Sequence, residues 1–417
     1  MADTTEILSD REQTLRHGSP QQEIPFSREE YRERLERIRQ VMARESIDLL
    51  YLSAPESMYY VSGYGSAWYQ AESFATPWSG VAVHVDHDDF ILFEFEAHTL
   101  LIRCYTVAND MRLYDGPIDD GSPLDFVVDE LKASGWTGGR VGLEMGSYRP
   151  NRRASEYFQA AFERAGCNVV DGTRVLREVR GVKSAAEMAC IEKAAQIADI
   201  GLEAAHETLR PGITELELWG EITAATARAG GENQALPMLV TSGLKAVSGH
   251  GLASRKQIAP GEPVFLDVCG VYNRYHVDQA RSFSIGEPHA DVVERINLSA
   301  GIFDVLRKIL HPNLPIQELN DTVVRYYEEA GIWENHGYIG GYELGIAFPP
   351  DWVGSFHYGV DEAPGEQKTF VPGTVANHES QFFLPHLQGY SILIDTMACT
   401  ESQARFLSRF PHQLTVV

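Results

Sequence analysis

Two aspartates eleven residues apart are the feature of this sequence that points most directly to chemistry. Asp267 and Asp278 flank a short connection containing Gly270 and Asn273, within a stretch, 262–286, that is typical of two strands joined by a tight turn. Residues equidistant from the centre of a hairpin face each other, with Cβ atoms about 4.5–5.5 Å apart. Like charges placed in this way repel, which favours a cation held between them. Two exposed loop aspartates are the alternative interpretation.

A second acidic pair repeats this arrangement near the end of the chain. The segments 374–384 and 390–400 predict another hairpin, and the midpoint between Glu379 and Asp395 falls at Leu387, in its turn. If the four carboxylates converge, each like-charge contact at 4 Å costs about 4 kcal/mol even at an effective dielectric constant of 20. Protons or divalent cations must then neutralise them. Two bridged cations (Mn, Fe, Co or Zn) would generate a hydroxide nucleophile from water.

The elements that must position these residues suggest two domains. After an N-terminal arm (1–25), residues 26–175 alternate between helical and strand patterns, which predicts an α/β domain. A second domain, 183–417, combines antiparallel strands with helices expected at 184–209, 214–229, 289–311 and 315–330. Ser184 with Glu187 predicts a capping box at the start of the first of these helices.

The amino-acid composition limits the classes of binding partner and the cellular compartment that we expect for this protein. The chain has 417 residues, with 35 basic against 59 acidic side chains, and its net charge of −24 argues against nucleic acid or an anionic membrane as a partner. No stretch approaches the length of apolar sequence that spans a membrane, and the N-terminus lacks the pattern of a signal peptide. Five scattered cysteines without a CxxC motif indicate reduced thiols in a cytoplasmic protein.

The order of these acids, with a glycine-rich stretch between the two pairs, resembles the "pita-bread" family, which includes methionine aminopeptidase, prolidase, aminopeptidase P, creatinase and ectoine hydrolase. FSREEYRERLERIRQVM and DLLYLSAPESMYYVSGY are similar to the creatinase/prolidase N-terminal domain. RGVKSAAEMACIEKAAQIADIG and SGHGLASRKQIAPGEPVFLDV are similar to the start of the catalytic domain and to its first active-site segment. The resemblance covers nearly the whole chain. It implies an α/β N-terminal domain followed by an α+β pita-bread catalytic domain.

The resemblance also implies roles for individual residues. Asp267, Asp278, Glu379 and Asp395 match metal-ligand positions, and His250 matches a substrate-side histidine that would move protons together with Glu379.

Two positions depart from the family pattern. Tyr342 stands where the family has a metal-binding histidine, and is itself a candidate catalytic residue, while the final acid is Asp395 where glutamate is usual. YELGIAFPPDW and YNRYHVDQARS look most like ectoine hydrolase, while the first catalytic-domain helix and the start of the chain look like creatinase. Both of those relatives work without metal, but they have lost the paired acids that remain in this chain.

Further candidates surround this set. Trp68 and Tyr69 lie in an aromatic loop that, in creatinase-like relatives, reaches the active site of the partner subunit, and packing at a domain or dimer interface is the alternative. His357 is a third candidate for contact with the substrate. His276 could support Asp278 from behind, with a buried structural histidine as the alternative, and Arg281 is expected to form a salt bridge behind Asp278. Glu343 could replace the missing histidine ligand, and His378 should point to the opposite face from Glu379.

Taken together, the residues and the resemblance predict a cytoplasmic, homodimeric hydrolase that cleaves a C–N bond in a small polar molecule, assisted by a divalent metal. Four alternatives remain open: a true Xaa-Pro dipeptidase, a metal-free enzyme of the ectoine hydrolase or creatinase type, a lyase of the dimethylsulfoniopropionate type, and a binding protein on a decayed peptidase scaffold.

Overall fold

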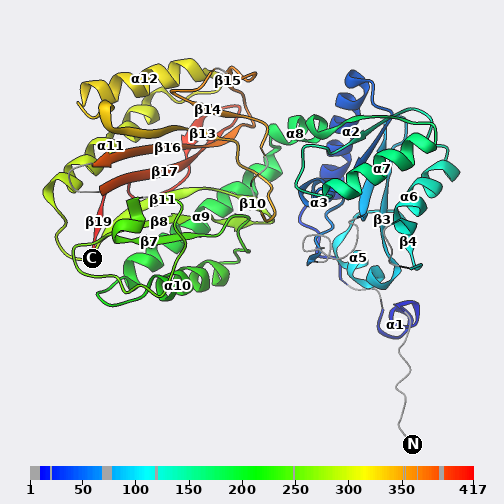
Figure 1. The fold of residues 1–417 in the computed structure, drawn as a ribbon, viewed down its shortest axis with the longest axis horizontal. Coiled ribbons are helices and arrows are strands. Elements are labelled where there is room, and N and C mark those ends of the chain that lie inside the picture. Colours follow the sequence, from blue (N-terminus) through cyan, green and yellow to red (C-terminus); the bar gives the residue numbers. More distant parts are fainter. Residues whose placement is uncertain are drawn as a thin grey trace, which may run out of the picture. The chain divides into compact units, whose positions relative to one another are not determined.

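The chain folds into two compact units, Met1–Val179 and Arg180–Val417, shown as a ribbon in Figure 1. The structure is a computed structural model. It describes residues 10–18, 21–67, 78–117, 121–247, 249–350, 352, 354–363, 365–384 and 389–417. Across these residues, no helix combines the length and the apolar character needed to cross a membrane.

The first unit is built on a six-stranded mixed sheet with strand order β4-β3-β2-β1-β5-β6. Strand β1 lies at its centre, antiparallel to β2 and parallel to β5. Helices α6 and α7 pack on this sheet, because Leu124, Phe158 and Phe162 share one core with Tyr51 and Phe93. The strands are β1 Leu49–Leu52, β2 Gly80–His84, β3 Phe90–Phe95, β4 Asp110–Tyr114, β5 Arg140–Leu143 and β6 Asn168–Asp171.

The helices of this unit are α1 Asp10–His17, α2 Arg28–Glu45, α3 Pro55–Ser62, η1 Glu96–His98, α5 Thr99–Tyr105, α6 Ser122–Ala133, α7 Arg152–Arg164 and α8 Thr173–Gly181. Helix α2 begins as its sequence predicts, since the Ser27 hydroxyl accepts a hydrogen bond from the backbone N–H of Glu30. Helix α1 lies within the stretch expected to be an irregular arm.

The second unit is built on a nine-stranded sheet. Its main path runs β14-β13-β16-β17-β11-β8-β7, with β18 paired to β17 and β19 paired to β11 (Figure 1). Two short two-stranded sheets, β9–β10 and β12–β15, complete it. The strands are β7 Leu239–Ser242, β8 Pro263–Val268, β9 Val271–Tyr272, β10 Tyr275–His276, β11 Gln279–Ser284, β12 Leu314–Pro315, β13 His336–Tyr342, β14 His357–Gly359, β15 Thr369–Phe370, β16 Val375–Leu384, β17 Gly389–Cys399, β18 Ala404–Phe406 and β19 Thr415–Val416.

One face of this sheet is covered by helices. Phe303 of α11 and Val323 of α12 share a core with Phe382 of β16 and with Leu393 and Met397 of β17. Because side chains alternate along a strand, the residues between these positions point to the other face. The helices of this unit are α9 Ala185–Thr208, α10 Glu215–Arg228, η2 Gly243–Val247, α11 Ala290–Ile309, α12 Ile316–Glu329 and η3 Trp333–Asn335.

Helix α9 starts with the predicted capping box. The Ser184 hydroxyl accepts from the backbone N–H of Glu187, whose carboxylate accepts from the backbone N–H of Ser184. Further along, α9 passes so close to the chain after β8 that a Cβ at Gly270 would lie 1.9 Å from the carbonyl oxygen of Ala194. Only glycine allows this approach, which holds the end of β8 against the helix.

Candidate active site

The first acidic pair lies on the predicted hairpin, but the register differs from the prediction. Strands β8 and β11 are antiparallel, and Asp267 pairs with Ala280 rather than with Asp278. Its two-residue turn is Asn273–Arg274, with φ of 50° and 64°, the positive angles of the turn that suits the twist of a hairpin. The centre therefore lies one residue later than the midpoint of the two acids. The carboxylates are diagonal neighbours on one face of the sheet.

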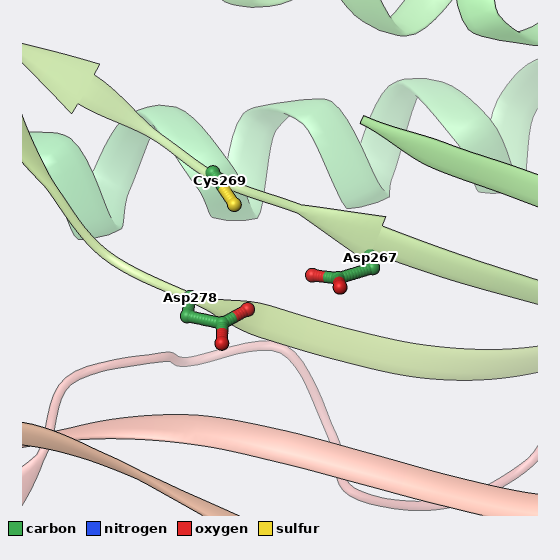
Figure 2. A group of neighbouring side chains, drawn as sticks. All are labelled: Asp267, Cys269 and Asp278. Carbon is green, nitrogen blue, oxygen red and sulfur yellow. The ribbon is translucent and has the colours of Figure 1, made fainter. Parts of the chain in front are cut away.

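These two acids and Cys269 form a compact group. One oxygen of each carboxylate and the Cys269 sulfur all lie within 4.8 Å of one another. Figure 2 shows the three side chains directed toward a common space. Asp278 is fully buried, and in the described part of the chain neither Oδ1 of Asp267 nor Oδ1 of Asp278 accepts a hydrogen bond, although both atoms are buried. Such orphaned oxygens are costly unless a cation or a proton reaches them.

Glu379 of the second hairpin joins the same group through the side-chain amide of Asn377. The Asn377 side-chain amide donates to Asp278 Oδ2 (2.8 Å) and to Glu379 Oε1 (3.0 Å), so it bridges the two carboxylates. The Gln381 amide donates to Glu379 Oε2 (2.8 Å). Strands β8 and β16 and the segment leading into β11 thus bring three acids together. The predicted convergence is correct for these three.

Asp395, the fourth predicted ligand, lies on the opposite face of the sheet. Strand register places His378 opposite Asp395 and Ile394 opposite Glu379, so the prediction that Glu379 and Asp395 face each other is wrong by one residue. The connection 385–388, which contains the predicted turn centre, is outside the described residues.

On the helix-covered face, Asp395 is part of a buried ionic network. Its Oδ2 accepts a hydrogen bond from Arg281 Nη2 (3.2 Å) and lies 2.7 Å from His412 Nε2. Burial would raise the pKa of Asp395, but the hydrogen bond with His412 and the charge of Arg281 lower it below its usual value. Arg281 was expected to pair behind Asp278, and it pairs with Asp395 instead.

The three clustered carboxyl groups resist ionisation. Burial raises the pKa of Asp267 well above its ordinary value, and the neighbouring charge of Asp278 raises it further. Burial likewise raises the pKa of Asp278. Burial first, and then the charge of Asp278, raise the pKa of Glu379 to about 8. At neutral pH the group must therefore share protons or hold a cation.

Tyr342 acts on the carboxylates as a donor. Its hydroxyl donates to Asp278 Oδ2 (2.9 Å), and its backbone N–H donates to Asn377 Oδ1 (2.7 Å). The neighbouring Glu343 was considered as a replacement ligand, but its side chain forms a buried ion pair with Lys183 (2.5 Å) and accepts hydrogen bonds from Ser355. Glu343 is therefore already neutralised away from the acidic group.

The predicted histidines separate into exposed and structural ones. His250, in the loop between η2 and β8, is exposed, and so is His357, which pairs with Tyr342 across β13 and β14 and so shares its face of the sheet. Their roles remain predictions. Trp68 and Tyr69 lie outside the described residues.

His276 and His378 are buried in the scaffold. His276 Nδ1–H donates to the carbonyl oxygen of Arg274 (2.8 Å) and Nε2 accepts from the N–H of Ala235 (3.0 Å), which fixes a neutral ring. Burial first, and then the charge of Arg274, lower its pKa to about 3. His378 lies on the helix-covered face, as predicted, with its ring against Phe303.

The residues present suit one cation better than two. The orphaned oxygens of Asp267 and Asp278 form a negatively charged pocket for a single ion. A second ion would need further anionic ligands, but Ile394 occupies the position facing Glu379, and Tyr342 and Asn377 already donate to Asp278 Oδ2.

Three residues close to the acids were missed in the sequence, namely Cys269, Asn377 and Gln381. Each is two positions from a predicted acid, on the same strand face, and this spacing could have identified all three.

Comparisons with known proteins agree with this architecture. Residues 34–182 match the family model of the creatinase/prolidase N-terminal domain, and residues 189–401 match that of metallopeptidase family M24. Ectoine hydrolase from Halomonas elongata is 26% identical over 411 residues, covering 94% of this chain and 98% of that protein. Xaa-Pro dipeptidase from Pyrococcus furiosus is 24% identical, covering 92% and 99%.

Solved structures share the fold. The X-Pro aminopeptidase of Thermotoga maritima superposes with a TM-score of 0.76 at 20% identity, covering 92% of this chain and 99% of that one. The prolidase of Pyrococcus horikoshii superposes with a TM-score of 0.73 at 20% identity, covering 90% and 98%. These matches confirm the predicted α/β N-terminal domain followed by a pita-bread catalytic domain. Since the catalytic-domain model spans just over half of the sequence, the chain belongs to metallopeptidase family M24 and is a hydrolase of C–N bonds.

Proposed function

We propose that this enzyme hydrolyses a C–N bond in a small polar molecule, with one divalent cation held by Asp267 and Asp278 and with Glu379 as the proton-transfer group. One observation carries the proposal: three carboxyl groups from separate strand segments, those of the buried Asp278 and Glu379 and of the half-buried Asp267, meet on the face of the sheet opposite to α11 and α12, and two of their oxygens lack a hydrogen-bond donor in the described chain. Clustered carboxyl groups with strongly raised pKa values are typical of functional sites.

Glu379 is suited to general acid catalysis. In the cation-free site, burial and the charge of Asp278 raise its pKa to about 8, which favours the protonated carboxyl group, and the leaving nitrogen of an amide needs a proton when the C–N bond breaks. Asn377 and Gln381 each donate to one of its oxygens, so they fix the carboxyl group in one orientation. A bound divalent cation would supply Lewis-acid polarisation of the substrate and activation of water.

The substrate side of the site is partly apolar. Ala280 and Ile394 pair with Asp267 and Glu379 in the ladder, and they form one buried cluster with Ala246, Phe265 and Ile392. An apolar floor beside carboxyl groups suits a compact substrate with a hydrocarbon portion next to its amide, such as the proline ring of an Xaa-Pro dipeptide or the ring of ectoine. Both substrate types occur in the names of the relatives.

His250 and His357 are candidates for substrate contact, and so are Trp68 and Tyr69 by the family resemblance alone. The homodimer and the cytoplasmic location are part of the same proposal and rest on the family resemblance and on composition. A metal-free hydrolase is the second candidate, favoured by the Tyr342 and Asn377 donors on Asp278, which stabilise that carboxylate without an ion. None of the relatives named above is a lyase, so we do not pursue elimination.

The test combines metal quantitation with a panel of ectoine, creatine and Xaa-Pro dipeptides. In Glu379→Gln we expect turnover to fall by about 10²–10⁴ while bound metal is retained, since only the proton-transfer group is lost. In Asp278→Asn we expect metal content and turnover to fall together. The control is Glu207→Gln, an exposed acid on α9. Unchanged turnover in Glu379→Gln would refute the assigned role, and full turnover of chelator-treated protein would favour the metal-free candidate.

A further inference from the structure

Cys269 occupies a position from which it can share a ligand with the two aspartates. It follows β8 two residues after Asp267, so both side chains project from the same face of the strand. The ladder continues past the end of β8, because Val277 N–H donates to the carbonyl oxygen of Gly270 (3.1 Å). In the register of β8 and β11, Cys269 therefore stands directly opposite Asp278.

The donor atoms of these three residues already lie close together. These atoms, one carboxylate oxygen each from Asp267 and Asp278 and the Cys269 sulfur, lie within 4.8 Å of one another, and Cys269 is only 4% exposed (Figure 2). Ligand atoms around a tetrahedral Zn²⁺ ion are about 3.5 Å apart, so these three donor atoms need to move only about 1 Å closer together to bind one ion.

A second observation concerns the hydrogen bonding of Asp278. Asp278 is completely buried, and its Oδ1 atom accepts no hydrogen bond from the described residues, although its Oδ2 atom receives two, from Tyr342 and Asn377. Glu379 is the other nearby acid, but the Asn377 and Gln381 amides already occupy its two oxygens. One oxygen each of Asp267 and Asp278 is thus left without a hydrogen-bond donor among the described residues, and both acids lie in the group that contains the Cys269 sulfur.

We propose that Asp267, Asp278 and the Cys269 thiolate form a single-cation site that selects a thiophilic ion, Zn²⁺ or Co²⁺, over Mn²⁺. Thiolate is a soft donor, and soft donors favour these ions, whereas Mn²⁺ prefers an all-oxygen set. Three protein ligands leave the fourth tetrahedral position open for water or substrate, the arrangement of catalytic rather than structural sites. The inference rests on the proposed function only in that a cation binds between the two aspartates.

Cobalt substitution tests the sulfur ligand directly, without reference to turnover. Metal-free protein is titrated with Co²⁺, and the near-ultraviolet charge-transfer absorption of a thiolate–Co²⁺ bond is recorded alongside the bound stoichiometry. We expect one ion per chain and a clear charge-transfer band in the wild type. Cys269→Ser, which preserves the size of the side chain, should lose the band and bind Zn²⁺ at least about tenfold more weakly, the lower end of the loss seen even for outer-sphere partners. Its affinity for Mn²⁺ should change little.

Cys190→Ser is the matched control, because Cys190 is also buried (6% exposed) and lies on α9. It should keep the band. Thermal unfolding of each variant shows that it is folded, and Cys269→Ala repeats the test if the serine variant melts early. A band that persists in a folded Cys269 variant, or bound Co²⁺ without a band in the wild type, overturns the thiolate ligand and leaves the proposed hydrolase intact. Failure of the wild type to bind Co²⁺ at all overturns the thiolate ligand and the proposed cation site together, and favours the metal-free hydrolase.

Discussion

The buried ion pair between Lys183 and Glu343 allows a test of what stabilises the end of β13, the strand that carries Tyr342. Lys183 precedes α9, and Glu343 directly follows β13, where Tyr342 contacts the acidic group. The side chains are 2% and 5% exposed, and Nζ lies 2.5 Å from Oε1. Burial would raise the pKa of Glu343, but the Lys183 charge and hydrogen bonds from Ser355 lower it. Replacing Lys183 by methionine therefore leaves a buried carboxylate without its counter-ion.

Removal of one partner from a buried pair costs about 3–5 kcal/mol. For a unit the size of Arg180–Val417, 1 kcal/mol shifts the melting temperature by about 2–4 °C, so Lys183→Met should lower it by roughly 6–20 °C. Lys183→Met/Glu343→Gln should recover most of this loss, because the second change removes the unpaired charge and keeps a carbonyl acceptor for Ser355. The loss in Lys183→Met should also shrink as pH falls, because the unpaired Glu343 takes up a proton.

The assay is differential scanning calorimetry, which follows the melting of each unit. The wild type, Lys183→Met, Glu343→Gln and the double variant together form a double-mutant cycle. Arg152→Met, which breaks an exposed pair with Glu156 on α7, is the control and should not change the melting temperature measurably. A Lys183→Met melting temperature equal to that of the control, or a coupling energy below about 0.5 kcal/mol, would refute the reasoning.

Three further predictions concern other positions. Burial raises the pKa of Glu144 from 4.5 to about 7, so the folded protein loses stability as the pH rises from 4.5 to 7 and this carboxyl group ionises. In Glu144→Gln, the free energy of urea unfolding should therefore depend less on pH between 4.5 and 7, and an unchanged pH dependence would contradict the raised pKa. Gly341→Ala places a Cβ 1.9 Å from the Asn377 carbonyl oxygen and should lower the melting temperature of the second unit. Gly220→Ala on helix α10, where an added Cβ meets no atom within 4 Å, should instead stabilise this unit by about 1 kcal/mol, and equal melting temperatures for the two variants would be inconsistent with the β13–β16 packing. Tyr342→Phe removes one of two hydrogen-bond donors to Asp278 Oδ2 and should lower the free energy of unfolding of chelator-treated protein by about 1–3 kcal/mol, measured by chemical denaturation. An unchanged free energy of unfolding would show that the hydroxyl group contributes nothing.

Much of the scaffold follows from local sequence. The capping box at Ser184 marks the start of α9, and the four helices expected in the second unit appear within two residues of their predicted bounds. Elements with weaker patterns were missed. Helix α8 (Thr173–Gly181) runs through most of the stretch between the two predicted domains, which end at 175 and begin at 183, and α1 lies within the predicted arm.

The site was predictable in its residue types but not in its register. Asp267, Asp278 and Glu379 do meet, as electrostatics and spacing suggested, whereas Asp395 does not join them. Asp395 fails to join because the register of β16 and β17 places Ile394 opposite Glu379. The first hairpin is displaced because the turn between β8 and β11 centres on Asn273–Arg274, and an arginine with positive φ is not a residue that sequence patterns assign to such a turn. A hairpin centre displaced by a single residue changes which side chains face each other.

The alternation along β16 and β17 also has an evolutionary consequence. His378 and Glu379 are neighbours in the chain, as are Ile394 and Asp395, yet His378 and Asp395 lie on the helix-covered face of the sheet and Glu379 and Ile394 lie on the face that carries the acidic group. Substitutions at alternate positions are therefore free to remodel reactivity while the intervening positions preserve the fold. A strand built in this way lets a lineage exchange one substrate for another without first sacrificing its stability.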